Sequence, residues 1–202
     1  MKITCKNIWM TNCYLVEGEN GAVVIDPGYK REAILDFLKE NENKERLILL
    51  THGHFDHIGG AEYLRSQTGV KIGIGALDEP ALSDDVLNCA VNFKRVISPF
   101  NADYLYNDGD VISVGDITLK VMHTPGHTVG GVCYLADGVV FTGDTLFKGT
   151  IGRDEFPGGD LETLKKSVKR LYTLDEDTVI YAGHGDSSTI GEEKNENPFV
   201  RP

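Results

Sequence analysis

The sequence predicts an α/β protein that folds as one domain over residues 1–202. Between residues 21 and 75, short apolar runs alternate with amphipathic stretches, which is typical of alternating strands and helices. Across roughly residues 96–147, Asp-Gly and Gly-Asp pairs separate apolar runs and indicate hairpin turns. With 202 residues, 41% of them hydrophobic, the chain is long enough to bury one sizeable core.

The first part of this pattern predicts the order strand, helix, strand, helix, strand. The expected strands are "GAVVIDPG" (21–28), "RLILLTHGH" (46–54) and "VKIGIG" (70–75). The expected helices are "YKREAILDFLKENEN" (29–43) and "DHIGGAEYLRSQTG" (56–69).

The second part predicts two strand pairs, a helix and a last strand. Residues 108–127 and 130–145 read as strands joined by tight turns, and "TVIYAGHG" (178–185) as a further strand. A helix is expected within 158–174, with Asp160 as its N-cap and one apolar face formed by Leu161, Leu164, Val168 and Leu171.

Composition excludes several classes of function. A net charge of -11 repels phosphate backbones, so we expect no nucleic-acid partner. No apolar run reaches the roughly 18–20 residues of a membrane span, and the start of the chain does not resemble a signal peptide. The four cysteines form no CxxC pair, which indicates neither a thiolate zinc site nor a disulfide framework. We therefore expect a cytoplasmic protein without a membrane partner.

Four apolar runs end in side chains that bind metals. They lead into "THGHFDH", "TPGHT", "TGDT" and "GHG", each with a glycine beside the candidate ligand that lets the backbone approach a site closely. Function in α/β sheets collects at the carboxyl ends of strands, so these four ends predict one convergent site, although antiparallel neighbours would end at opposite edges.

The stretch "THGHFDH" is the densest of the four. If residues 52–54 are extended, His52 and His54 project the same way and could bind one metal. Asp56 and His57 open the following helix and could face a second metal. A single histidine after a strand is usually a hydrogen-bonded loop residue. Four potential ligands in HxHxDH order make that interpretation a poor one here.

The distant candidates differ in strength. His127 is expected to be a ligand because Pro125 and Gly126 fix a turn at a strand end. Asp144 follows an apolar strand, where a cation would compensate a buried carboxylate and two oxygens could bridge two ions. His184 fits the pattern of a ligand, with a loop cap as its alternative.

Two further residues are placed outside the ligand set. His123 is more typical of a hydrogen-bonded residue at the end of a strand. Asp26 in "VVIDPG" is expected to support a ligand rather than bind a metal, although an aspartate before Pro-Gly is also a common turn former.

In this order and spacing, the four motifs resemble the metallo-β-lactamase superfamily over nearly the whole chain, and within it the glyoxalase II-like (hydroxyacylglutathione hydrolase-like) enzymes. The resemblance implies a four-layer αβ/βα sandwich with two mixed β-sheets and a site for two divalent metals, zinc first and iron or manganese as alternatives. It also implies how the seven ligands divide: His52, His54 and His127 for one metal; Asp56, His57 and His184 for the other; and Asp144 between them.

The same resemblance implies hydrolysis of a small thioester, such as an S-acylglutathione, by metal-bound hydroxide. Asp56 would also be catalytic by orienting that hydroxide. We expect no helical C-terminal domain of the kind that binds glutathione in full-length glyoxalase II enzymes, and we expect the tail "TIGEEKNENPFV" near the mouth of the site. Arg153 occupies about the place of a basic residue that contacts glutathione, so it is a candidate substrate-binding residue; an ion pair with Asp154 or Glu155 is the alternative.

The main competing function is a persulfide dioxygenase of the same superfamily. Its single iron would use His52, His127 and Asp144, a set of two histidines and one carboxylate that leaves positions open for oxygen. Retention of all seven ligands favours the two-metal hydrolase. A metal-stabilised binding module is disfavoured, because structural zinc sites are usually closed sets of four ligands that are rich in cysteine.

Overall fold

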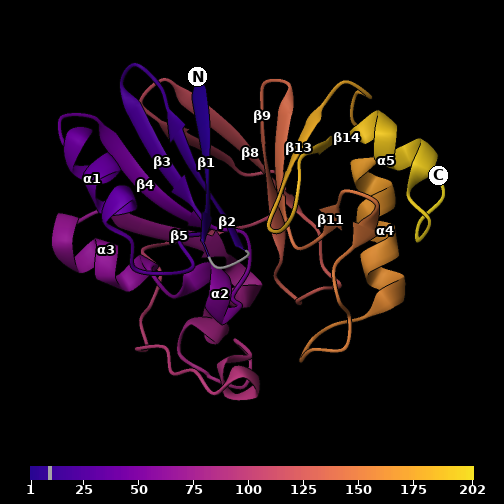
Figure 1. The fold of residues 1–202 in the computed structure, drawn as a ribbon, viewed down its shortest axis with the longest axis horizontal. Helices are drawn as coiled ribbons and strands as arrows, with labels where there is room; N and C mark the ends of the chain where they lie inside the picture. The colour runs from indigo at the N-terminus through magenta and orange to yellow at the C-terminus, as the bar shows by residue number, and fades with distance from the viewer. Residues whose placement is uncertain (9–10) are drawn as a thin grey trace.

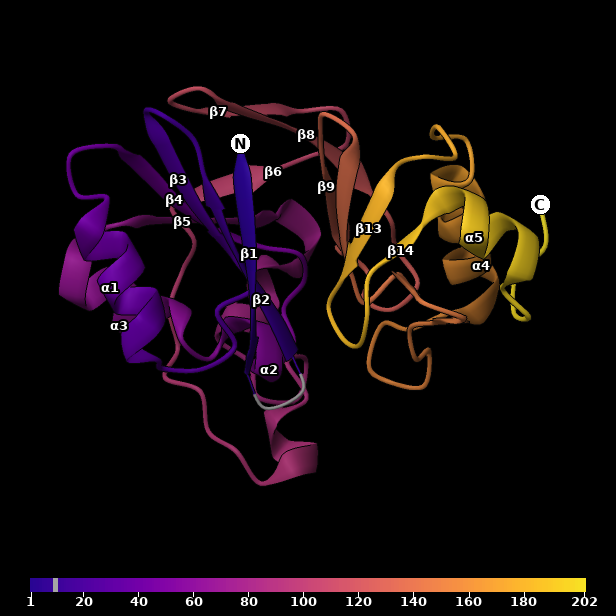
Figure 2. The same ribbon diagram turned by 45° about the horizontal axis from the view of Figure 1, so that its top comes forward.

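Two six-stranded mixed sheets pack face to face in the computed structural model, with helices on both outer faces (Figure 1). The structure describes residues 1–8 and 11–202. This arrangement confirms the predicted α/β sandwich, and its four layers are visible in both ribbon views (Figure 2).

The first sheet has the strand order β1-β2-β3-β4-β5-β6. The pairs β1/β2 and β2/β3 are antiparallel, whereas β3, β4, β5 and β6 run parallel to one another. Its strands are β1 (Lys2–Ile8), β2 (Thr11–Glu17), β3 (Gly21–Ile25), β4 (Glu45–Leu50), β5 (Lys71–Gly75) and β6 (Tyr104–Tyr106).

The second sheet has the order β14-β13-β10-β9-β8-β7, and a separate two-stranded ribbon lies beside it. All its neighbouring pairs are antiparallel except β10/β13. Its strands are β7 (Val111–Val114), β8 (Ile117–His123), β9 (Val132–Ala136), β10 (Val139–Gly143), β13 (Val179–Ala182) and β14 (Ser188–Thr189); the ribbon is β11 (Leu146–Phe147) with β12 (Thr150–Ile151).

Three buried apolar clusters lie between the four layers and stabilise their packing. One lies between the first sheet and α1 and α3, one lies between the two sheets, and one lies between the second sheet and α4 and α5. The helices are α1 (Glu32–Glu40), α2 (Phe55–Ile58), α3 (Ala61–Thr68), α4 (Leu161–Leu171) and α5 (Ile190–Glu196), with 3₁₀ turns η1 (Ala76–Leu82) and η2 (Ala90–Phe93).

The helix predicted within 158–174 is α4. The Asp160 side chain accepts a hydrogen bond from the Thr163 N–H at 2.8 Å, as expected of an N-cap. Leu164, Val168 and Leu171 are fully buried in the outer core, whereas Leu161, at the first turn, is 37% exposed. The predicted apolar face is therefore correct except at its first residue.

Two sequence expectations on segment boundaries are wrong. The helix expected over 56–69 is split into α2 and α3, because the Gly60 N–H donates to the Pro27 carbonyl at 2.7 Å instead of continuing the first helix. Residues 96–103, expected to be strand-like, contain no strand before β6.

The strands that carry the predicted ligands end at one place in the molecule. In the first sheet β3 and β4 are parallel. In the second sheet β8 and β10 both run antiparallel to β9, and β10 is parallel to β13, so β8, β10 and β13 share one direction. The four motifs therefore still meet at one edge in these mixed sheets. In the second sheet, β9 is antiparallel to both of its ligand-bearing neighbours, β8 and β10, so those two strands end on the same side.

The C-terminal tail lies away from the site mouth, contrary to expectation. Helix α5 packs in the outer core with α4, where the Tyr172 hydroxyl donates to the Glu193 carbonyl at 3.0 Å. Its links toward the site loops are indirect: the Gly149 N–H donates to Glu193 Oε2 at 2.9 Å, and the Asn197 side-chain amide donates to the Thr150 carbonyl at 3.2 Å. Among the described helices, none is long and apolar enough to cross a bilayer.

Candidate metal centre

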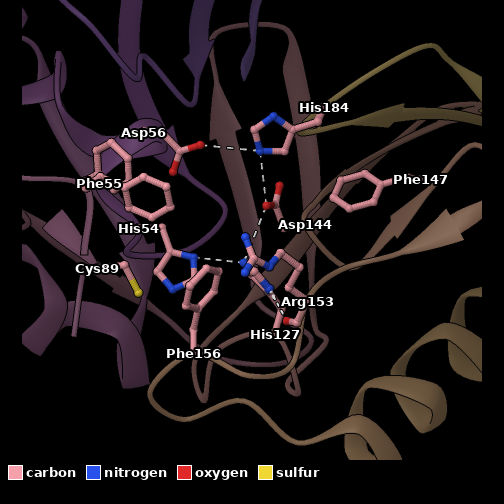
Figure 3. Close-up of a pocket in the computed structure, with 11 residues that line it drawn as sticks. His54, Phe55, Asp56, Cys89, His127, Asp144, Phe147, Arg153, Phe156 and His184 are labelled. Atoms are coloured by element: carbon pink, nitrogen blue, oxygen red, sulfur yellow. Dashed lines mark hydrogen bonds and ion pairs between the residues drawn. The ribbon is translucent and has the colours of Figure 1, made fainter. Parts of the chain in front are cut away.

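All seven predicted ligands converge at the edge between the two sheets. His52, His54, Asp56 and His57 lie in the loop after β4 and in α2, on the side of the first sheet. The other three follow strands of the second sheet: His127 after β8, Asp144 after β10 and His184 after β13 (Figure 3).

The first group is formed by three buried histidines that could hold one metal ion. His54 Nδ1 lies 3.1 Å from His52 Nε2 and 2.9 Å from His127 Nε2. Ligands at about 2.0–2.1 Å from a tetrahedral zinc lie roughly 3.3 Å from one another, so these separations are close to those of a coordinated set.

The second group consists of Asp56, His57 and His184 and could hold another ion. His57 Nε2 lies 3.7 Å from Asp56 Oδ2 and 3.4 Å from His184 Nε2, and Asp56 Oδ2 lies 3.4 Å from His184 Nε2. The Thr11 hydroxyl donates to Asp56 Oδ2 at 3.0 Å and so helps to orient the carboxylate.

Asp144 lies between the two groups. Its Oδ2 is 3.5 Å from His127 Nε2 of the first group and 3.3 Å from His184 Nε2 of the second. Its Oδ1 is 3.3 Å from His57 Nε2. This is the placement that a bridging carboxylate requires.

The hydrogen bonds behind the histidines test whether these residues suit a metal. The Arg153 carbonyl, which can only accept, lies 2.6 Å from His127 Nδ1, so a neutral His127 carries its proton there and turns the Nε2 lone pair toward the cluster. In the same way His57 Nδ1 lies 2.9 Å from Asp26 Oδ2, which leaves His57 Nε2 for an ion. The donor set therefore fits a cation at each group.

Asp26 has the supporting role that the sequence predicts. Besides contacting His57, it accepts hydrogen bonds from the Thr51 N–H at 2.7 Å and from the Thr51 hydroxyl at 2.6 Å. The Thr51 hydroxyl also lies 3.1 Å from His52 Nδ1, so one carboxylate braces a histidine of each group. His123 lies outside the cluster as expected, with its Nε2 2.9 Å from the Val129 carbonyl.

The protonation equilibria of the cluster differ between residues. Burial holds the pKa of His52 and of His54 well below the ordinary value. Burial alone would also lower the pKa of His57, but the carboxylates of Asp144, Asp56 and Asp26 outweigh it and hold that pKa well above its ordinary value. Burial alone would raise the pKa of Asp144, yet its histidine neighbours hold it well below its ordinary value.

Asp78 is an important residue that the sequence analysis missed. This carboxylate is 3% exposed and lies in η1. Its Oδ2 accepts from the Gly53 N–H at 2.9 Å and from the Thr128 hydroxyl at 2.8 Å, and its Oδ1 accepts from the Gly130 N–H at 2.6 Å. Asp78 thus ties the loop that carries His52 and His54 to the loop that carries His127. An aspartate in "ALDEPAL" gives no local sign of this long-range role.

Two glycines beside the ligands are required for space rather than for an unusual φ. A Cβ on Gly183 would lie 2.2 Å from Asp144 Oδ1 and 2.8 Å from His57 Cε1. A Cβ on Gly53 would lie 2.4 Å from the Cβ of Ala81. Both loops can approach the centre only because these side chains are absent.

A cavity of about 500 Å³ opens onto the two groups. The sequence analysis did not predict its apolar wall, which consists of Phe55, Cys89, Phe93, Phe147 and Phe156. Arg153 lines the same cavity (Figure 3). Its side chain is 60% exposed, pairs with Glu155 through Nε at 2.7 Å, and lies over the Phe156 ring at 4.4 Å. The structure therefore contains the ion pair that is the alternative to a substrate-binding role for Arg153.

Comparison with known proteins agrees with this geometry. The family model described as the metallo-beta-lactamase superfamily matches residues 7–184. The chain belongs to this superfamily. Its relatives include the hydroxyacylglutathione hydrolase GloC of Haemophilus influenzae, which is 38% identical over 94% of this chain and 92% of its own length.

Solved structures show the same fold over the whole chain. That of the BLEG-1 B3 metallo-beta-lactamase has a TM-score of 0.91 and is 34% identical, with 100% of both chains covered. That of TTHA1623 in a di-iron-bound form has a TM-score of 0.86 and is 33% identical, with 99% of this chain and 100% of the other covered. The chain is thus similar to a protein that binds two iron ions.

Proposed function

We propose that the chain is a dinuclear metal-dependent hydrolase of small thioesters. The observation that carries this proposal is a second three-residue group beside the first, with the Asp144 carboxylate near both, because the second group supplies ligands for a second ion. The similarity to a hydroxyacylglutathione hydrolase supports the substrate class.

In this proposal each predicted ligand keeps the role given above. His52, His54 and His127 hold one ion, Asp56, His57 and His184 hold the other, and Asp144 contacts both. Zinc is the first candidate for the two ions. Iron is the alternative, because a similar protein has been solved in a di-iron-bound form. When bound, two such ions lower the pKa of a shared water and stabilise the developing oxyanion of an acyl substrate.

The residues themselves account for the rest of the reaction. Asp56 lies at the cavity surface, fixed by the Thr11 hydroxyl, and orients the attacking water. A thioester releases a thiolate, which leaves without a strong general acid, so the absence of a further acid among the described lining residues does not oppose the reaction. Arg153 is the one cationic side chain among them and would contact a substrate carboxylate if Glu155 released it.

The test is to measure metal content and turnover on the same preparation. We expect two metal ions per chain and hydrolysis of S-lactoylglutathione, followed through the loss of thioester absorbance. A β-lactam serves as the counter-substrate, because a lactamase is among the similar structures. Two bound ions with no thioester hydrolysis would contradict the substrate class.

The second candidate is a mononuclear iron persulfide dioxygenase. The distance of 3.5 Å between His127 Nε2 and Asp144 Oδ2 is compatible with an iron held by His52, His127 and Asp144. In that case the second group would be superfluous. One iron per chain, with oxygen uptake that depends on glutathione persulfide, would replace the hydrolase proposal.

A further inference from the structure

The side chains of the cavity wall indicate which kind of thioester the site prefers. This inference rests on the proposed thioester hydrolysis. In the cavity, phenylalanine rings lie on either side of the metal-binding side chains (Figure 3). The Phe156 ring lies 5.4 Å from His54 and 6.4 Å from His127, on the side of the first group. The Phe147 ring lies 5.9 Å from His184, on the side of the second.

The rings on the first side form one continuous apolar surface. Ring centroids are 4.9 Å apart between Phe55 and Phe93 and 6.5 Å apart between Phe93 and Phe156. Phe55 also belongs to a small buried cluster with Cys89 and Ala90, and Phe156 packs against that cluster. Packing with these neighbours therefore holds Phe55 and Phe156 in place.

This wall suits an apolar substituent and does not suit glutathione. Glutathione carries two carboxylates and an ammonium group, and their recognition requires charged or hydrogen-bonding partners. Among the described lining residues, Arg153 is the one cation, and it already pairs with Glu155 and stacks on Phe156. Phe93 is 50% exposed, so it offers apolar surface that a ligand would cover.

We infer that the physiological substrate carries an apolar hydrocarbon group of several carbons, aliphatic or aromatic, next to the thioester, and that this group packs against Phe55, Phe93 and Phe156. The group belongs either to the acyl part or to the thiol part, because both are attached to the same carbonyl carbon. Hydroxyacyl groups and peptide thiols are the poorer substrates.

The experiment is a substrate series with the metal-loaded full chain. The acyl arm compares lactoyl, hexanoyl and phenylacetyl thioesters of N-acetylcysteamine, an uncharged thiol. The thiol arm compares acetyl thioesters of benzyl mercaptan and glutathione. In one arm, kcat/KM for the apolar member is expected to exceed that for the polar member by about tenfold or more. Equal values in both arms would overturn the inference and leave the thioester hydrolase intact.

Matched variants test which side chains produce the preference for apolar substrates. Phe93→Ala is expected to lower kcat/KM for the preferred apolar substrate about tenfold more than that for the lactoyl substrate. Phe199→Ala is the control, because Phe199 is 55% exposed and lies outside the cavity lining. Phe156→Leu is a second variant that keeps an apolar side chain in the small core. Equal losses for apolar and polar substrates in Phe93→Ala would overturn the inference.

Binding separates this inference from the proposed function. Calorimetric titration with hexanoate, phenylacetate and lactate requires no turnover. Tighter binding of the apolar acids that is lost in Phe93→Ala supports the apolar site even if every thioester proves inert, in which case only the proposed reaction fails. Equal affinity for the three acids, together with a flat substrate series, would refute the apolar site.

Discussion

Replacing Asp78 with asparagine should weaken metal binding although Asp78 is not a proposed ligand. The change keeps the shape of the side chain but leaves one oxygen to serve three donors: Gly53 N–H, Thr128 hydroxyl and Gly130 N–H. Whichever way the amide is oriented, its NH₂ group faces at least one buried backbone N–H. A buried donor without an acceptor costs about 1–3 kcal/mol.

The net loss should lie near the lower end of that range. Burial raises the pKa of Asp78, so the ionised carboxylate is itself costly and its removal offsets part of the loss. For a chain of this size, the corresponding fall in Tm is roughly 2–6 °C. Because Asp78 joins the loop of His52 and His54 to the loop of His127, affinity for the first metal should fall about 10–100-fold.

The assay is metal titration of the chelated Asp78→Asn variant, with Tm measured in parallel. Asp116→Asn is the matched control, because the exposed Asp116 also accepts two backbone N–H bonds, from Glu19 and Asn20, at the end of β8 remote from the site. The control should keep normal metal affinity. Equal metal affinity in Asp78→Asn and the wild type, whatever the Tm, would show that Asp78 does not position the ligand loops.

Other changes test the same site. His184→Ala should reduce the metal content from two ions to one while the protein stays folded, as counted by elemental analysis; unchanged stoichiometry would remove His184 from the second group. Gly183→Ala should lower both metal content and turnover, because its Cβ overlaps Asp144 Oδ1, and normal values for both would contradict that packing. Asp26→Asn should lower metal affinity about 10–100-fold by disturbing the His57 tautomer, measured by competition with a chelating dye; an unchanged affinity would refute the bracing role. Removal of both metals with a chelator should lower Tm, and an unchanged Tm would show that no ion binds preferentially to the folded state.

Much of the site could be predicted because its ligands are marked locally in the sequence. Each of the four motifs follows an apolar strand and has a glycine beside at least one candidate ligand, so the strand period locates the motif without knowledge of the pairing. Asp26 could be placed in a supporting role by the same pattern. That the ligand strands point to one edge depends on an even number of antiparallel steps between β8 and β10, which is a property of the whole sheet.

The residues that sequence reasoning missed act over long distances. Asp78 contacts residues 25 to 52 positions away, and nothing in its own segment marks it as a buried acceptor. Phe55, Phe93 and Phe156 form one wall only after α2, η2 and the loop of Phe156 have packed together. The C-terminal tail was misplaced because its expected position rested on the resemblance alone, and no local pattern indicates that it packs with α4.

The most direct test of the two-metal hydrolase is stepwise metal loading of the chelated protein with thioester turnover measured at each step. We predict that hydrolysis of S-lactoylglutathione or of an apolar thioester rises until two equivalents are bound and requires the second. Saturation at one equivalent of iron, with persulfide-dependent oxygen uptake and no thioester hydrolysis, would contradict the account.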